Sequence, residues 1–209
     1  MKKIIFTVAI MFAVCITASA QKAKSGEWSS AYVQYNPMTF VVDYQGSEDL
    51  DFTGFTVGYN KAFSIAGKTP LFITVGGELN AAFYSDSYQD EDVSDTYINV
   101  RVPALLTYKW NVSDNINILP YAGLYARIGI VANEKYEDEH DSETISLFDK
   151  KDMGSKDATW GRLQIGTQIG FNVEFNSKWY LGLSYSTDLS NVCKKCSFTT
   201  YAITAGLNI

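Results

Sequence analysis

The residues best suited to acid–base or nucleophilic chemistry lie together in one acidic stretch. His140 is the only histidine of the chain, and Asp138, Glu139, Asp141 and Ser142 surround it. A histidine beside carboxylates and a hydroxyl is the residue set of a hydrolase or an acyltransferase. These residues are contiguous, however, whereas a catalytic triad brings its members together by geometry from separate elements. A solvated charged loop explains the stretch better, and we predict that the chain is not an enzyme and has no catalytic residues.

A second candidate site is the CxxC pair Cys193 and Cys196. A redox CxxC normally begins a helix in a βαβ fold, and a zinc site would need two further ligands nearby. Neither context is predicted, and no loop has the glycine and ligand spacing of a calcium site. We therefore predict a disulfide between Cys193 and Cys196, no metal and no other cofactor.

A third group consists of charged residues on the polar side of alternating segments. Arginine suits an enclosed site because its planar fork can bind a carboxylate through two hydrogen bonds. If that side is enclosed, the charges must pair with each other, either as a polar plug that holds the fold or as a selectivity gate. The six residues are Glu78, Arg101, Lys109, Arg127, Arg162 and Glu174.

The elements that carry these charges have the two-residue period of β-strands, and no 3.6-residue period stands out. Several segments exceed ten residues, which is long for soluble strands and fits tilted membrane strands. The eight segments run approximately over 28–36, 52–63, 71–84, 96–110, 116–132, 159–175, 178–187 and 198–209.

Alternation alone fits two architectures. A soluble sandwich or lipocalin-like carrier turns the apolar face inward, and a membrane barrel turns it outward. Three features favour the membrane barrel. The connections alternate between short and long, the long ones over 85–95 and 133–158 are acidic, and aromatic residues such as Phe83, Tyr108, Trp160 and Trp179 lie near strand ends. The predicted fold is an all-β, eight-stranded, antiparallel up-and-down transmembrane barrel.

The N-terminus predicts export. Lys2 and Lys3 precede an apolar run over residues 4–16 and small residues up to Ala20, which is the pattern of a cleaved secretory signal peptide. We expect residues 1–20 to be removed and residues 21–209 to form the barrel domain. The net charge of −6 argues against a nucleic-acid partner.

The chain resembles the small outer-membrane β-barrel family of the OmpA/OmpX type, in its porin-family form common in Gram-negative bacteria. The resemblance rests on the signal, the strand pattern, the stretches 100–110 and 119–125, and the alternating last strand. It implies an integral outer-membrane protein, in contact with outer-membrane lipid and inserted by the barrel-assembly machinery. One departure is the last residue, Ile209, where the family often has an aromatic residue.

The function that follows is structural or one of surface contact. The barrel would have a lumen filled with polar side chains, and its acidic external loops would contact an extracellular ligand that the sequence does not identify. A lipid-modifying enzyme, a narrow channel and the lipocalin-like carrier remain as alternatives.

Overall fold

The computed structural model describes residues 26–43, 49–65, 69–88, 91–137 and 141–209. The predicted signal peptide and His140 lie outside the described residues. Eleven strands and one short helix make up these ranges. They are β1 Trp28–Tyr35, β2 Met38–Val42, β3 Leu50–Ser64, β4 Leu71–Tyr88, β5 Glu91–Tyr108, β6 Trp110–Ser113, β7 Ile116–Glu137, β8 Ser142–Ser146, α2 Lys150–Met153, β9 Leu163–Phe175, β10 Trp179–Asp188 and β11 Cys196–Asn208. In the ranges above, no helix has the length and apolar character needed to cross a membrane.

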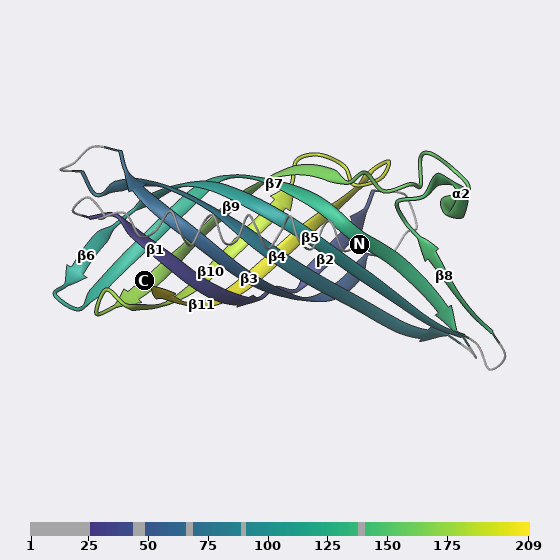
Figure 1. Ribbon diagram of the computed structural model, residues 1–209, viewed down its shortest axis with the longest axis horizontal. Coiled ribbons are helices and arrows are strands. Elements are labelled where there is room, and N and C mark those ends of the chain that lie inside the picture. Colours follow the sequence, from purple (N-terminus) through teal and green to yellow (C-terminus); the bar gives the residue numbers. More distant parts are fainter. Residues whose placement is uncertain (1–25, 44–48, 66–68, 89–90, 138–140) are drawn as a thin grey trace.

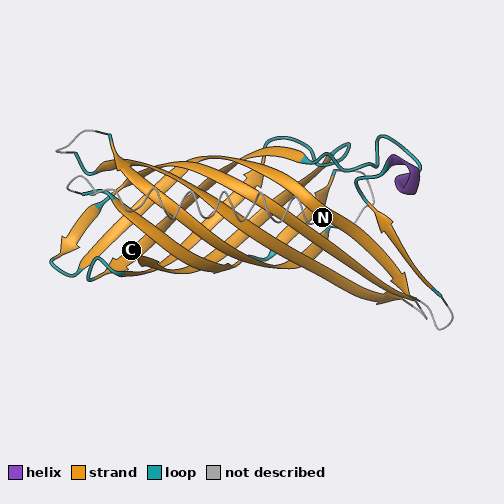
Figure 2. Ribbon diagram, viewed as in Figure 1, coloured by secondary structure: helices purple, strands orange, loops and turns teal. Residues whose placement is uncertain are grey.

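The strands close into a ring of antiparallel neighbours (Figures 1 and 2). β1 pairs with β11 on one side and with β3 on the other, so no edge remains along the wall. β2 continues β1 beyond Asn36 and Pro37 and pairs with the same two neighbours. The ring therefore runs through eight strands, with β6 and β8 as additions that each pair with β7. Closure satisfies the backbone polar groups between strands, which a lipid environment demands.

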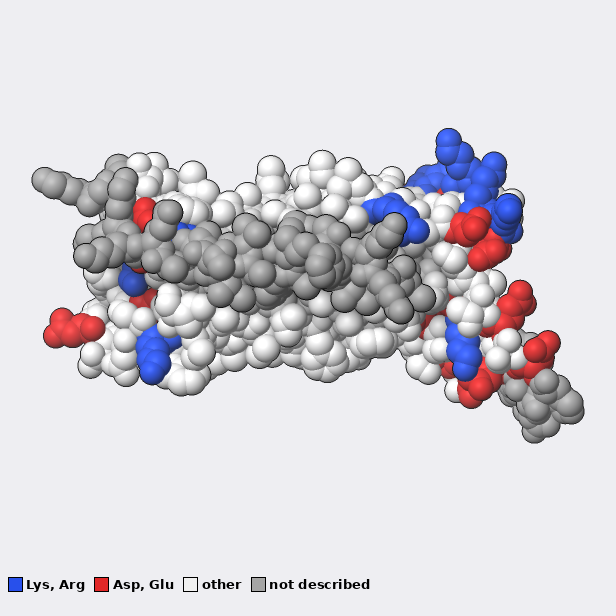
Figure 3. All heavy atoms as spheres, viewed as in Figure 1, with Lys and Arg blue, Asp and Glu red and all other residues white. Residues whose placement is uncertain are grey.

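The faces of the wall have the inside-out arrangement of a membrane barrel. In β9, Leu163 is 61% exposed while its neighbour Gln164 is fully buried. Ile203 and Thr204 of β11 show the same contrast, with the isoleucine outside. On the face in Figure 3, charged side chains gather toward the two ends, and the described residues that are visible between them are uncharged. An apolar belt between charged ends fits a wall surrounded by hydrocarbon.

The two rims differ as predicted. Short connections join β3 to β4, β6 to β7 and β9 to β10 at the rim that also holds the C-terminus, on the left in Figure 1. The opposite rim carries β8, α2 and the connection from β10 to β11. Phe83, Tyr108 and Trp179 are exposed near strand ends, as an aromatic girdle requires. Trp160 differs, because it is buried inside the barrel mouth.

The acidic connections are more ordered than the sequence predicts. Most of 85–95 belongs to the hairpin of β4 and β5, and 133–158 contains the end of β7, all of β8 and α2. Acidic residues have low strand propensity, which led to the prediction of loops. Despite that propensity, β5 pairs with β4 and with β7 beyond the ring, and the three strands continue there as one sheet.

Candidate functional site

The lumen holds five of the six charged residues that the sequence places on the polar face: Glu78, Arg101, Lys109, Arg127 and Glu174. Glu78, Glu174 and Asp188 each pair with a cation inside the lumen, and the three pairs lie at successive levels between the two rims. Side chains rather than an open channel fill the space, as expected for eight strands. Flat-lying tyrosines contribute to this filling, because Tyr32 and Tyr180 pack against Gly58 and Gly206, where a Cβ atom would collide with the rings.

The central pair is Glu78 with Arg101. These residues are direct partners in the register of β4 and β5, and the Arg101 Nε donates to the Glu78 carboxylate. The other carboxylate oxygen accepts from the Tyr32 hydroxyl at 2.6 Å. The guanidinium also lies 5.0 Å from the centre of the Tyr125 ring. Both carboxylate oxygens are thus satisfied, which a buried charge requires.

The second pair lies near the rim with the short turns. The Lys109 Nζ lies 2.8 Å from a carboxylate oxygen of Glu174 and 4.9 Å from the centre of the Trp28 ring. Glu174 also accepts from the side-chain amides of Asn117 at 2.6 Å and Asn208 at 2.5 Å. Lys109 lies in the one-residue interruption between β5 and β6.

The third pair joins Arg127 to Asp188, the last residue of β10. The Arg127 Nη2 donates to one carboxylate oxygen, and the Tyr125 hydroxyl donates to the other at 2.7 Å. The backbone N–H of Phe198 donates to the same carboxylate at 3.1 Å. Sequence reasoning missed Asp188 by counting it as loop. The inward order Tyr180, Gly182, Ser184, Ser186 continues to Asp188 and was the signal that could have found it.

Arg162 does not join this network, which corrects the sequence prediction. It precedes β9, lies exposed at the external rim, and directs its Nη1 to the backbone carbonyls of Gly129 and Ile130 at 3.3 Å each. Its guanidinium covers the Phe148 ring at 4.1 Å. Arg162 lies two residues before Gln164, so the two-residue alternation would point both side chains into the lumen. Arg162 precedes the start of β9, however, and its side chain stays outside the lumen.

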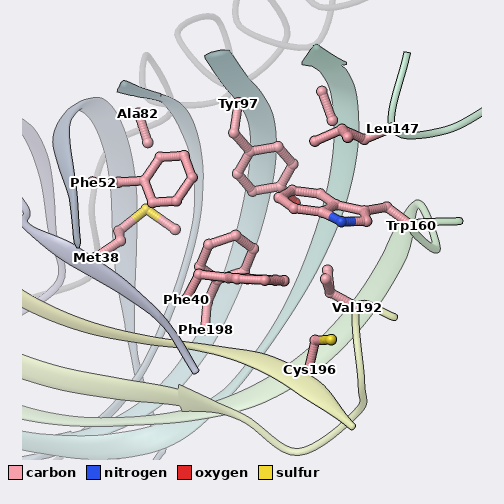
Figure 4. Close-up of a cluster of buried hydrophobic side chains, with 11 residues drawn as sticks. Met38, Phe40, Phe52, Ala82, Tyr97, Leu147, Trp160, Val192, Cys196 and Phe198 are labelled. Carbon is pink, nitrogen blue, oxygen red and sulfur yellow. The ribbon is translucent and has the colours of Figure 1, made fainter. Parts of the chain in front are cut away.

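The external half of the lumen also differs from the predicted polar filling, because aromatic side chains occupy it (Figure 4). The Tyr97 and Phe198 rings stack at 5.3 Å, and Trp160 stacks on Phe40 at 5.1 Å. Phe52 meets Phe198 edge-on at 5.9 Å. We call this cluster the aromatic plug, and its members are Met38, Phe40, Phe52, Ala82, Tyr97, Ala132, Leu147, Trp160, Val192, Cys196 and Phe198.

The connection between β10 and β11 covers the plug. Cys193 and Cys196 are joined by a disulfide, with Cys196 buried in the plug and Cys193 packed against it. The backbone N–H of Val192 donates to the carbonyl of Cys196 at 2.8 Å, and that of Gly161 donates to the carbonyl of Val192 at 2.6 Å. The disulfide therefore helps to hold a tight lid across the external end of the lumen.

Beyond the lid stands the sheet formed by the ends of β4, β5 and β7 together with β8. We call it the external sheet. It begins past the pair of Thr53 and Phe83, because β4 has no β3 partner beyond Phe83. Asp95 and Glu134 are cross-strand partners at its base. Burial, reinforced by the nearby Glu134 carboxylate, raises the pKa of Asp95 from its ordinary value to about 7.

Charges at the external end are segregated. The acids of the external sheet lie at the lower right of Figure 3, while lysines gather over α2. In this second region Asp149 accepts from the N–H of Lys151, and Asp157 pairs with Lys194 at 2.7 Å. Among the residues that the structure describes, no three histidine, cysteine or carboxylate side chains come together as a metal site would require.

A closed antiparallel wall with an apolar exterior and an ion-paired interior defines a transmembrane β-barrel. The chain belongs to the outer membrane protein beta-barrel domain family, whose model matches residues 6–208. It is an integral outer-membrane protein. A comparison with curated protein sequences found no match.

Solved structures with the same fold include proteins of different kinds. Ail, the attachment invasion locus protein of Yersinia pestis, was solved with the heparin analogue sucrose octasulfate; it is 13% identical, with a TM-score of 0.52 over 88% of this chain and 99% of that chain. Neisserial surface protein A is 11% identical, with a TM-score of 0.43 over 88% and 97% of the two chains. The outer membrane enzyme PagL is 13% identical, with a TM-score of 0.42 over 88% and 100%.

Proposed function

We propose that this protein is a non-enzymatic outer-membrane barrel whose external sheet contacts basic partners outside the cell. The observation that carries the proposal is the continuation of β4, β5 and β7 past the closed ring, with β8 added at the side. A barrel that only needed to span the membrane would have no use for strands of this length. Outer-membrane lipid surrounds the wall in this account, and the barrel-assembly machinery inserts it.

The charge of the external sheet supports a basic partner. Lys135 is the only base among the described residues of 84–95 and 133–146. Complementary charge steers association and suppresses wrong partners. The acids among the described residues of the same ranges are Asp86, Glu91, Asp92, Asp95, Glu134, Glu137, Asp141 and Glu143.

The contents of the lumen support a role without transport. A solute would have to displace three ion pairs and the aromatic plug, and breaking a buried pair costs several kcal/mol. We therefore expect the purified protein to give no steady conductance in planar bilayers. His140→Ala should likewise leave the lipid composition of cells unchanged, whereas a lipid-modifying enzyme that used this histidine would lose activity.

The test shortens the external sheet without touching the ring. Ser85 and Ser94 are cross-strand partners, so replacing residues 86–93 by Asn-Gly should close a tight hairpin in the same register. Cells that display this variant should adhere less to a surface coated with poly-L-lysine than cells with the wild type. The matched control is Lys150→Gln/Lys151→Gln/Lys156→Gln on the lysine side, which should keep full adhesion. Equal adhesion of the shortened variant and the wild type at equal surface abundance would refute the proposal.

A further inference from the structure

Basic side chains gather at the external end over α2, apart from the acids of the external sheet (Figure 3). The segments 147–162 and 189–196 carry six bases against three acids, in a chain whose net charge is −6. Backbone hydrogen bonds hold the two segments together, since the N–H of Lys194 donates to the carbonyl of Asp157 at 3.1 Å. We call these bases the basic patch, and its members are Lys150, Lys151, Lys156, Arg162, Lys194 and Lys195.

The three acids of the same segments are already engaged. Asp149 and Asp152 each accept a backbone N–H, at 2.9 and 2.8 Å, and Asp157 pairs with the Nζ of Lys194 at 2.7 Å. Four members of the patch have no carboxylate within ion-pair distance in the described ranges, namely Lys150, Lys151, Lys156 and Arg162. All four are exposed, so an anion from outside the chain can reach them.

The members of the patch lie near one another because the lid and the α2 region share contacts. The hydrogen bond and the charge of Lys194 lower the pKa of Asp157, and Lys156 adds to that effect, so both ammonium groups lie near one carboxylate. The Arg162 guanidinium covers the ring of Phe148, just before α2. Its bonds to backbone carbonyls both use Nη1. The Nε and Nη2 donors are left for an external acceptor, and the guanidinium fork suits a phosphate.

The apolar exterior of the wall reaches the patch at two leucines. Leu163 follows Arg162 directly and is 61% exposed, and Leu189 is 65% exposed. The backbone N–H of Leu189 donates to the carbonyl of Ile165 at 2.8 Å, so both leucines lie at the external ends of neighbouring strands, β9 and β10. A ligand with an anionic head and apolar chains fits this junction, because its head meets the bases while its chains stay against the leucines. A soluble polyanion would leave the leucines uncovered.

We propose that the basic patch binds the phosphorylated headgroup of lipopolysaccharide, the glycolipid of the external leaflet, with acyl chains along Leu163 and Leu189. Clusters of lysine and arginine where a protein leaves the membrane bind anionic headgroups, and each base adds to the attraction. The bound lipid would fix the α2 region and the lid at the membrane surface. The patch is separate from the external sheet, so this proposal does not depend on the basic partner of that sheet.

The experiment titrates the detergent-folded full chain by calorimetry at equal ionic strength without divalent cations. The three probes are lipid A with both phosphates, the same lipid A after removal of its phosphates, and a heparin oligosaccharide. Phosphorylated lipid A should bind at least tenfold more tightly than either of the other two. Lys150→Gln/Lys151→Gln/Lys156→Gln should weaken its binding by roughly 100-fold, at about fivefold per base.

The matched control removes three charges elsewhere. Lys61→Gln/Lys135→Gln/Lys178→Gln neutralises one base of the external sheet and two near the short turns, and it should keep full affinity. Leu163→Ser/Leu189→Ser should weaken lipid A and leave the heparin oligosaccharide unchanged. Heat-modifiable gel mobility verifies that each variant is folded. Equal binding of the two forms of lipid A, heparin binding as tight as that of phosphorylated lipid A, or an equal loss in the control would overturn the proposal.

Discussion

Arg127 and Asp188 form a buried ion pair at the boundary between the polar lumen and the aromatic plug. The Arg127 guanidinium belongs to both environments, because it binds the Asp188 carboxylate and lies 5.0 Å from the centre of the Phe198 ring and 5.6 Å from that of Tyr97. Asp188 in turn fixes the start of β11 through the backbone N–H of Phe198. One pair therefore links the wall, the plug and the lid.

Removing one member of this pair should be far more damaging than removing both. Asp188→Leu leaves the Arg127 charge buried without a partner, and we expect a loss of about 3–5 kcal/mol in the free energy of unfolding. The double variant Arg127→Met/Asp188→Leu should recover most of that loss, since it leaves no unpaired charge. Urea unfolding of the protein in lipid vesicles measures both values. A double variant no more stable than Asp188→Leu would contradict the pairing.

The aromatic plug should stabilise the barrel without being the only seal. Phe198→Ala removes the ring at its centre and should cost about 3–5 kcal/mol. Conductance should remain absent, because the central and rim ion pairs still block the lumen. Phe171→Ala is the control on the outer face, where Phe171 is exposed to lipid, and it should cost clearly less. A smaller loss for Phe198→Ala than for Phe171→Ala would show that the plug is not packed.

The sequence was most informative about the wall. The two-residue period shows which residues share a face of the wall, and the lengths of the connections distinguish the rims. Glu78 and Arg101 could be expected to meet, because the two-residue alternation points both side chains inward on neighbouring strands. The alternation alone could not pair Lys109 with Glu174, since Lys109 lies between β5 and β6 while Glu174 lies on β9, and β7 stands between them.

The aromatic plug was the main feature that the sequence left hidden. Phe198 precedes Thr200 and Thr204 on the inward side of β11, and Tyr97 precedes Asn99 and Arg101 on that of β5. Trp160, which the sequence analysis placed near a strand end as part of a lipid girdle, belongs to the plug instead. An aromatic residue near a strand end belongs to the girdle if its side chain points outward and to the plug if it points inward. Its place in the two-residue alternation of the strand therefore decides between the two.

The stability of the external sheet should depend on pH through Asp95. Asp95 is 7% exposed, one of its carboxylate oxygens has no partner, and burial together with Glu134 raises its pKa from 3.8 to about 7. Between these two pH values the unfolded chain releases a proton that the folded sheet keeps, so stability falls as pH rises from about 4 to about 7. The loss amounts to at most about 4 kcal/mol.

Asp95→Asn removes the cost of ionising a buried carboxyl. The amides of its external sheet should therefore be equally well protected from hydrogen exchange at pH 5.5 and at pH 8. Hydrogen exchange of the β5 and β7 amides beyond the ring, corrected for intrinsic rates at pH 5.5 and pH 8, measures the effect. Wild-type protection should decrease toward pH 8. A wild type whose protection does not change with pH would show that Asp95 ionises like an exposed carboxyl.

The disulfide between Cys193 and Cys196 should act locally. The loop it closes is short, so Cys193→Ser/Cys196→Ser should lower global stability by less than a typical disulfide, whose contribution is about 2–4 kcal/mol. The lid over the plug should open more often, and trypsin should cut faster after Lys194 or Lys195. Wild-type protein treated with reductant is the control and should behave like the variant. Unchanged cleavage rates would indicate that Val192 and Gly161 hold the lid without the disulfide.

The central claim is that apolar side chains of the wall face lipid and polar ones are enclosed. Spin labels on single cysteines along residues 200–205 of β11 test it directly, because Cys193 and Cys196 are bonded and do not react. Labels at Tyr201, Ile203 and Ala205 should collide strongly with oxygen dissolved in the bilayer, while labels at Thr200, Ala202 and Thr204 should be shielded. Strong collision of the Thr200 and Thr204 labels with a water-soluble nickel complex, with Tyr201 and Ile203 shielded from both reagents, would contradict the account.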